Sequence, residues 1–284
     1  MASSLAWITG AAGLIGNYLV HTAPRLASKR QVIGLTREQL DLTDFKVVRQ
    51  KFREQKPRLI IHCAALSRSP ACEQNPSLAR KLNVEVTARL AELAADIPLV
   101  FCSSDLVFDG QQGNYDESAP PNPLSVYAET KVAAEQIVLA NPKHTVVRMS
   151  LNGGVSLNAD RGFNEELRHA WKNGETVKLF TDEFRCPMPA AVTARVVWEL
   201  VEQNRRGLFH VAGSERLSRW EIGQLIAARW PQLCPRLEPA SRKDYSGPPR
   251  PADTSLNCAK IQKLLSFPLP GLGEWLETNP HELF

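Results

Sequence analysis

The sequence predicts an α/β fold, in which a doubly wound parallel sheet carries helices on both faces and a smaller lobe follows it. Three observations indicate this fold. Short apolar runs alternate with Ala- and Glu-rich stretches through the first half of the chain. A glycine-rich turn joins the first apolar run to the first helical stretch. The second half is richer in proline and in short elements, which is typical of a lobe added to a sheet.

Taken in order, the elements follow this alternation. We expect strands at 5–9, 31–35, 59–63, 99–103 and 144–149, and helices at 14–26, 76–95 and 126–140. In the second half we expect helices at 191–203 and 220–230 and a strand at 207–212, whereas 231–251 reads as a loop rich in Pro, Arg and Ser. The predicted layout is a cofactor domain over residues 1–150 and a smaller substrate lobe over 151–284. The lobe is discontinuous, because some of its segments return to the first domain.

The bulk composition favours an ordinary soluble protein. The 34 basic and 30 acidic residues leave a formal net charge of +4, with no basic run of the kind that binds nucleic acid. Six cysteines form no CxxC pair and have no metal-ligand spacing, which suits a reducing compartment. No signal peptide is evident, and no apolar stretch approaches the roughly 20 residues of a membrane span. We therefore expect a cytoplasmic protein without a membrane or nucleic-acid partner.

The turn after the first strand carries the pattern of a nucleotide-binding loop. Residues 9–16 read TGAAGLIG, so three glycines follow a strand and open a helix. Such glycines allow a tight turn, a close approach of the backbone to a pyrophosphate, and close packing of helix on strand. The helix start would offer its unpaired N–H groups to phosphates. The alternative is an ordinary glycine-rich turn. The loop predicts a Rossmann-type fold that binds NADP or NAD through Gly10, Gly13, Leu14, Ile15 and Gly16.

The end of the second predicted strand bears on which dinucleotide is bound. An acidic residue there binds a ribose hydroxyl, whereas an arginine favours the 2′-phosphate of NADP. This strand ends in Thr36 and Arg37, with no carboxylate at Thr36, so NADP is favoured over NAD. Two features keep NAD open: Arg37 could be a solvated surface residue, and Glu38 lies next to it.

Tyr127 and Lys131 form the candidate proton-transfer pair. They lie four residues apart in a predicted helix and therefore share one face of it. An ammonium near a phenol stabilises the phenolate and lowers a pKa that is otherwise near 10. The tyrosine could then exchange a proton with a carbonyl or carbinol oxygen while hydride moves to or from a nicotinamide. Ser103 and Ser104 end the fourth strand, where a hydroxyl could bind the same oxygen. An isolated pair of this spacing could equally be a surface feature.

Together these residues resemble the extended short-chain dehydrogenase/reductase family, and more closely its dTDP-4-dehydrorhamnose reductase-like branch. The resemblance covers most of the chain in the family's order. Its segments are TGAAGLIG at 9–16, DLTD at 41–44, HCAA at 62–65, SSDLVFDG at 103–110, YAETK at 127–131 and RPADTSLNCAKI at 250–261.

The resemblance implies a role for each matching residue. It implies catalytic roles for Ser104, Tyr127 and Lys131. Asn83 looks like the family's helix asparagine, although a surface amide is an alternative, and Arg185 and Arg250 could be structural ion-pair residues instead of phosphate ligands. The implied cofactor ligands are Arg37, Asp41, Leu42, Ala64, Ala65, Tyr127 and Lys131 with the loop glycines, and the implied substrate ligands are Ser67, Asp105, Phe108, Arg185 and Arg250.

Two departures from the branch pattern matter for function. The segment FRCPM at 184–188 replaces the branch's F-G-x-P-T, which leaves the substrate open. Asn17 and Tyr18 stand where some members carry an acidic residue for a metal-linked dimer, so we expect no metal, although a homodimer remains possible. The leading hypothesis is an NAD(P)-dependent reductase of a nucleotide-linked 4-keto sugar. The alternatives are a sugar-nucleotide epimerase or dehydratase, and a non-catalytic regulatory subunit resembling that of methionine adenosyltransferase.

Overall fold

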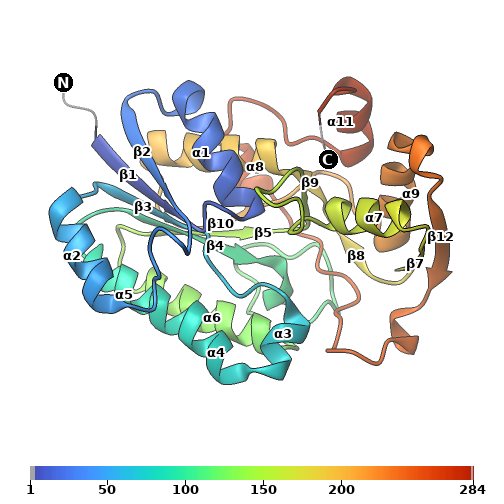
Figure 1. The fold of residues 1–284 in the computed structure, drawn as a ribbon, viewed down its shortest axis with the longest axis horizontal. Helices are drawn as coiled ribbons and strands as arrows, with labels where there is room; N and C mark the ends of the chain where they lie inside the picture. Colours follow the sequence, from blue (N-terminus) through green and yellow to red (C-terminus); the bar gives the residue numbers. More distant parts are fainter. Residues whose placement is uncertain (1–3, 283) are drawn as a thin grey trace.

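A six-stranded parallel sheet forms the centre of the molecule (Figure 1). The computed structural model describes residues 4–282 and 284. The strand order is β10-β5-β4-β3-β1-β2, and every neighbouring pair is parallel. The strands are β1 (Ser4–Thr9), β2 (Arg30–Leu35), β3 (Leu59–His62), β4 (Leu99–Ser104), β5 (Thr145–Met149) and β10 (Gly207–Val211). The predicted Rossmann-type α/β class is confirmed.

Helices cover both faces of this sheet, as Figure 1 shows. Alternate strand residues point to opposite faces, so each buried strand supplies two cores. Ile61 of β3 faces the core under α1 (Leu14–Leu26) and α8 (Ala190–Glu202). Ile60 faces the other core, under α5 (Val86–Leu93) and α6 (Val126–Leu139), which α2 (Phe45–Gln55) extends. The predicted helices at 14–26 and 126–140 agree with α1 and α6, whereas α2 was not predicted.

The prediction of one regular α-helix over 76–95 is wrong. The chain there forms α4 (Pro76–Arg80), a π-helical turn η1 (Lys81–Glu85) and then α5, preceded by α3 (Ser69–Gln74). Within the π-helical turn, Asn83 is 1% exposed and its amide bonds to the loop after β3 and to α6. Such turns are commonly found at functional sites. The alternative reading of Asn83 as a surface amide is therefore wrong.

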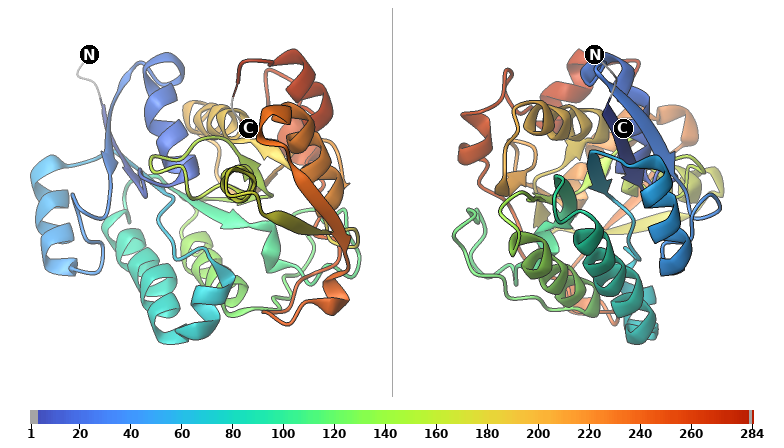
Figure 2. Two further views of the ribbon diagram at one scale, coloured as in Figure 1. Left: turned by 45° about the vertical axis from the view of Figure 1, so that its right-hand side comes forward. Right: turned by 90° about the vertical axis from the view of Figure 1, so that its left-hand side faces the viewer.

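The later residues build a lobe at one end of the sheet (Figures 1 and 2). Its core joins α7 (Phe163–Lys172), α9 (Arg219–Arg229) and α11 (Leu272–Thr278) to the parallel pair β7 (Thr176–Phe180) and β12 (Arg236–Ala240). β12 lies inside 231–251, so the prediction of a loop throughout that range is wrong. The remaining short elements are η2 (Asp105–Val107), β6 (Asn152–Gly153), β8 (Phe184–Arg185), β9 (Met188–Pro189), β11 (Leu217–Ser218), η3 (Pro231–Leu233), η4 (Arg242–Asp244) and α10 (Ala259–Gln262).

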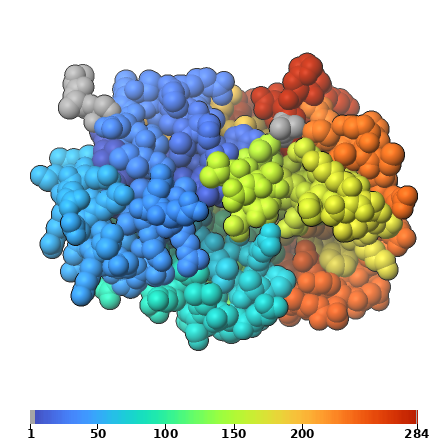
Figure 3. Space-filling view, in the orientation of Figure 1, coloured from blue at the N-terminus to red at the C-terminus, as the bar shows by residue number. Residues whose placement is uncertain are grey.

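Segments from the second half of the chain complete the central sheet and one of its helical layers. β10 and α8 follow residue 150, yet β10 pairs with β5 and α8 packs on α1. In the space-filling view of Figure 3, the first half occupies one side of the molecule and the lobe the other. No helix among the described residues has the length and apolar character needed to cross a membrane.

Candidate active site

The candidate site lies at the carboxyl ends of the strands, where β1 and β3 are neighbours. In open parallel sheets this reversal of strand order opens a crevice for ligands. The turn after β1 passes very close to the residue that follows β3. Gly10 has φ +71°, and a Cβ on it would lie 2.6 Å from the Ala64 nitrogen. A Cβ on Gly16 would lie 2.2 Å from the Gly10 oxygen, so α1 packs on this turn only with glycine at both positions.

The start of α1 is open to a phosphate. Its N-cap residue Gly13 makes no side-chain capping bond, and no acidic residue lies in the first turn, which begins with Leu14 and Ile15. The unpaired N–H groups and the helix dipole therefore favour an anion at this end. The three glycines and this helix start fit the pyrophosphate of a dinucleotide.

A buried hydrogen-bond chain fixes the β1–β3 junction. The Thr9 hydroxyl lies 2.7 Å from Nδ1 of His62, and Nε2 of His62 lies 3.1 Å from the Thr87 hydroxyl. Thr87 donates onward to the Asn83 carbonyl oxygen, which requires His62 to donate from Nε2 and accept at Nδ1. Burial lowers the pKa of His62 from 6.5 to about 3, and the charge of Lys131 adds to this. His62 is therefore a neutral structural residue beneath the crevice.

The loop after β2 gathers charged groups. Arg37 is exposed, and its charge, together with that of Lys81, contributes to lowering the pKa of Asp41. The larger causes are hydrogen bonds to Asp41 from the backbone and side chain of Thr43. The sequence reasoning missed Lys81, because nothing local indicates that η1 lies beside this loop. Arg37 and Lys81 together could hold an additional phosphate.

The other predicted cofactor residues line the same edge. Leu42 is half-buried against the core under α5 and α6. Ala64 is half-buried and Ala65 is exposed, directly after β3. Their contacts with a nucleotide stay predictions.

Tyr127 and Lys131 both lie on the buried side of α6, which starts at the Ser125 cap. Lys131 is 3% exposed, and its ammonium donates to the Cys102 carbonyl oxygen at 2.5 Å and lies 4.0 Å from the centre of the Phe101 ring. Burial lowers the pKa of Lys131 from 10.5 to about 8. The pair therefore faces the end of β4, not solvent.

Tyr127 itself is 8% exposed, and burial raises the pKa of its phenol well above 10. The neighbouring Ser104 side chain lowers this pKa, and the charge of Asp105 raises it further. The cation that lowers the pKa of Tyr127 is Arg185, whereas the Lys131 ammonium is turned to the backbone of β4. The expectation that Lys131 lowers this pKa is thus corrected for the arrangement seen here.

Ser104 lies at the end of β4, and two of the predicted substrate ligands lie behind it. Ser104 accepts a hydrogen bond from the Leu106 nitrogen at 3.2 Å and caps the short helix η2. Asp105 is fully buried and forms an ion pair with Arg185, which is 6% exposed. Arg185 therefore has the structural ion pair that the sequence left open as an alternative to a phosphate contact.

The remaining predicted substrate residues differ in their exposure and in their partners. Ser67 is exposed after β3. Phe108 is 1% exposed and stacks on Tyr115 with ring centres 4.1 Å apart, so its role in this structure is packing. Arg250 pairs with Glu183 at 2.5 Å and lines a small cavity. The same cavity is lined by Ser69, Pro70, Leu106, Leu124, Ser125, Glu183, Tyr245, Pro248, Pro249 and Pro251.

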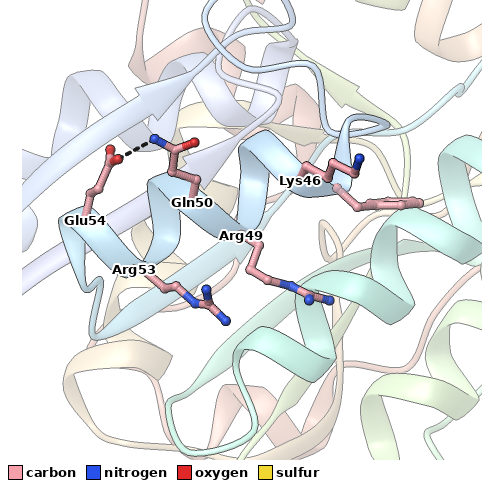
Figure 4. A pocket seen from close by; sticks show the side chains of 6 residues that line it. Lys46, Arg49, Gln50, Arg53 and Glu54 are labelled. Atoms are coloured by element: carbon pink, nitrogen blue, oxygen red, sulfur yellow. Dashed lines mark hydrogen bonds between the residues drawn. The ribbon is translucent and has the colours of Figure 1, made fainter.

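A second hollow lies away from these residues, on the outer surface of α2 (Figure 4). Lys46, Arg49 and Arg53 project beside it, and Gln50 donates to Glu54 at 2.8 Å. One helix supplies all of its lining residues, and none of them belongs to the predicted site. Among the residues that the structure describes, no cluster of three His, Cys, Asp or Glu side chains could hold a metal ion.

Sequence comparisons with known proteins identify the family. The profile of the RmlD substrate binding domain matches residues 6–279. Methionine adenosyltransferase 2 subunit beta of Xenopus laevis is 30% identical over 276 residues, which cover 92% of this chain and 83% of that protein. The probable low-salt glycan biosynthesis reductase Agl14 of Haloferax volcanii is 29% identical, with 94% of each chain covered.

A solved structure agrees over nearly the whole chain. The dTDP-4-dehydrorhamnose reductase of Bacillus anthracis, crystallised in complex with NADP, superimposes with a TM-score of 0.87 at 25% identity. The match covers 97% of this chain and 98% of that one. The chain therefore belongs to the RmlD substrate-binding-domain family, in the dTDP-4-dehydrorhamnose reductase-like branch of the extended short-chain dehydrogenases/reductases.

Proposed function

We propose that this protein is a nicotinamide-dependent reductase of a nucleotide-linked 4-keto sugar, with Ser104, Tyr127 and Lys131 as its catalytic residues. One observation carries the proposal: the Ser104 side chain lies close enough to the Tyr127 phenol to lower its pKa at the end of β4, and the buried Lys131 donates to the backbone of the same strand. This edge of the sheet also carries the glycine loop. A complete proton-transfer set beside a dinucleotide crevice is characteristic of an enzyme.

The proposed cofactor is NADP, with NAD as the alternative. Gly10, Gly13 and Gly16 fit a pyrophosphate, and Arg37 and Lys81 would hold the 2′-phosphate of NADP. The Bacillus anthracis relative, which binds NADP, supports this choice. The cytoplasmic location and the homodimer expected from the sequence stay predictions.

The proposed chemistry assigns a task to each hydroxyl. A reduced nicotinamide, when bound, would supply the hydride for the C4 carbonyl carbon of the sugar. Tyr127 gives its phenolic proton to the carbonyl oxygen, and Ser104 donates a hydrogen bond that stabilises the developing negative charge. The ammonium of Lys131, which donates to the Cys102 carbonyl oxygen here, would turn toward Tyr127 one helical turn away and stabilise the phenolate that remains.

The direct test is turnover with NADPH and a dTDP-4-keto sugar, followed by the loss of NADPH absorbance. We expect Tyr127→Phe to lower kcat by on the order of 100-fold or more, because the proton donor is lost. Tyr18→Phe, at a half-buried tyrosine of α1 whose hydroxyl accepts from the Val155 nitrogen, is the matched control. If no keto sugar is reduced, the substrate assignment is wrong.

A second candidate is a binding subunit, because methionine adenosyltransferase 2 subunit beta of Xenopus laevis is 30% identical to this chain. A pull-down with a methionine adenosyltransferase catalytic subunit tests it. Capture that persists in Tyr127→Phe, together with no reductase activity in the unmodified protein, would favour this role over the enzyme.

A further inference from the structure

The carboxylate of Asp105 joins four separate segments behind the candidate catalytic hydroxyls. Both of its oxygens accept from the guanidinium of Arg185, with Nε to Oδ2 at 2.7 Å. Oδ2 also accepts from the hydroxyl of Ser150 at 2.8 Å and from that of Thr254 at 3.3 Å. These partners come from β8, from the residue after β5 and from the C-terminal segment. Asp105 thus ties the substrate lobe to the strand end that carries Ser104.

Ser104 is only loosely held by this carboxylate. Its oxygen lies 3.3 Å from Oδ1 of Asp105, beyond the 2.5–3.0 Å that is usual between two oxygens. Its oxygen also accepts from the Leu106 N–H at 3.2 Å, a bond that leaves the hydroxyl proton available. Since Nη2 of Arg185 donates to the same Oδ1 atom, the guanidinium competes with Ser104 for this oxygen and weakens its hold on the Ser104 proton.

We propose that Arg185 is a positioning residue that, by pairing with Asp105, keeps the hydroxyl of Ser104 free to donate to the substrate oxygen. The inference rests on the function proposed above. It also changes the interpretation of Arg185, because a 6% exposed guanidinium whose Nε and Nη2 are committed to Asp105 has little left for a substrate phosphate.

The surrounding charges agree with this role. Asp105 raises the pKa of the Tyr127 phenol and Arg185 lowers it, so the two charges act in opposite directions at this hydroxyl. Glu183 lies 3.8 Å from Nη1 of Arg185 and is shared with Arg219 and Arg250. Removing Arg185 would leave Asp105 as a buried charge without its cation, and Ser104 is the hydroxyl that donates to the oxygen that Nη2 of Arg185 would vacate, Oδ1.

A double-mutant cycle tests whether Arg185 affects catalysis through Ser104. We expect Arg185→Met to lower kcat about tenfold or more with little change in KM, and Ser104→Ala to lower kcat on the order of 100-fold. In the Ser104→Ala background, Arg185→Met should cost no more than about twofold further, because residues that act as a unit are not additive. Additive losses, or a raised KM with kcat preserved, would overturn the proposal.

Arg216→Met is the matched control. Arg216 pairs with Asp253 at 2.6 Å and stacks on Phe184, the neighbour of Arg185, yet it does not contact Asp105. It should leave kcat within about twofold of the unmodified protein, since exposed ion pairs contribute little. If it lowers kcat as much as Arg185→Met does, the effect belongs to the lobe in general and the proposal fails.

A structural measurement separates this proposal from the function on which it rests. In a crystal structure of Arg185→Met, we expect the Ser104 oxygen to move to within 3.0 Å of Asp105. A Ser104 oxygen that stays in place contradicts the proposal, whether or not any keto sugar is reduced. If Arg185→Met does not fold, Arg185→Lys takes its place in both measurements. The lysine keeps the positive charge but cannot donate to both carboxylate oxygens as the guanidinium does, so Ser104 should still shift toward Asp105 and kcat should still fall.

Discussion

At the scale of single residues, the charge of Lys131 depends on pH near neutrality because the side chain is buried. Burial lowers its pKa to about 8, so the ammonium is present below that pH and is lost as the pH rises through it. Because the ammonium stabilises the phenolate of Tyr127 in the proposed reaction, we expect kcat/KM to fall above about pH 8. Lys131→Met should be slow at every pH and lack this alkaline decline. Lys143→Met, at an exposed lysine, should keep the unmodified pH profile.

His62 makes the folded state sensitive to acid. Its pKa is about 3 in the folded protein and 6.5 when unperturbed, so the unfolded chain binds a proton first as the pH falls. The contribution of His62 to the free energy of unfolding should therefore be at its maximum above pH 6.5. It should decrease toward pH 3 by at most roughly 1.4 kcal/mol per pH unit. His210, whose pKa burial lowers to about 4, contributes in the same direction.

Urea denaturation at a series of pH values measures this slope. His62→Gln should unfold at lower urea concentration at pH 7 and show a shallower decline of stability with acid. His281→Gln, at an exposed histidine, should not change the slope. An unchanged slope in His62→Gln would show that another group causes the acid sensitivity.

At the scale of elements, the junction of β1 and α1 depends on contact between two glycines. Gly16→Ala would place a methyl group 2.2 Å from the Gly10 oxygen, so α1 would have to move away from the turn. We expect a loss of at least tenfold in NADPH affinity, measured by fluorescence titration, and a lower melting temperature. Gly174→Ala provides the comparison, because Gly174 has φ +72° but open space around it. That variant should lose only about 1–2 kcal/mol of stability and bind NADPH normally.

At the scale of the whole molecule, the sheet is completed only by the second half of the chain. Trp198 of α8 is 1% exposed and donates from its indole nitrogen to the Leu19 carbonyl oxygen of α1 at 3.2 Å. A fragment of residues 1–150 would lack β10 and α8, and would expose the core under α1. We expect that fragment to show no cooperative unfolding by circular dichroism, whereas the full chain does. A cooperative transition in the fragment would mean that the first domain is independent.

Much of this architecture follows from local patterns. Buried parallel strands are continuous apolar runs, so 59–63 could be recognised as β3 with an error of one residue. The predicted helix at 14–26 has the same bounds as α1, because the preceding glycine and the apolar periodicity are both local signals. The shared helix face of Tyr127 and Lys131 follows from their spacing alone.

The sequence by itself determined the fold class, the glycine loop, the position of the tyrosine–lysine pair and the family. Tertiary structure alone decided that β12 pairs with β7, that η1 turns Asn83 inward, that the charge of Lys81 acts on Asp41 and that Arg185 pairs with Asp105. The physical reason is distance along the chain. Arg185 and Asp105 are 80 residues apart, and the partner of a buried charge is chosen by packing, which no local pattern of residues records.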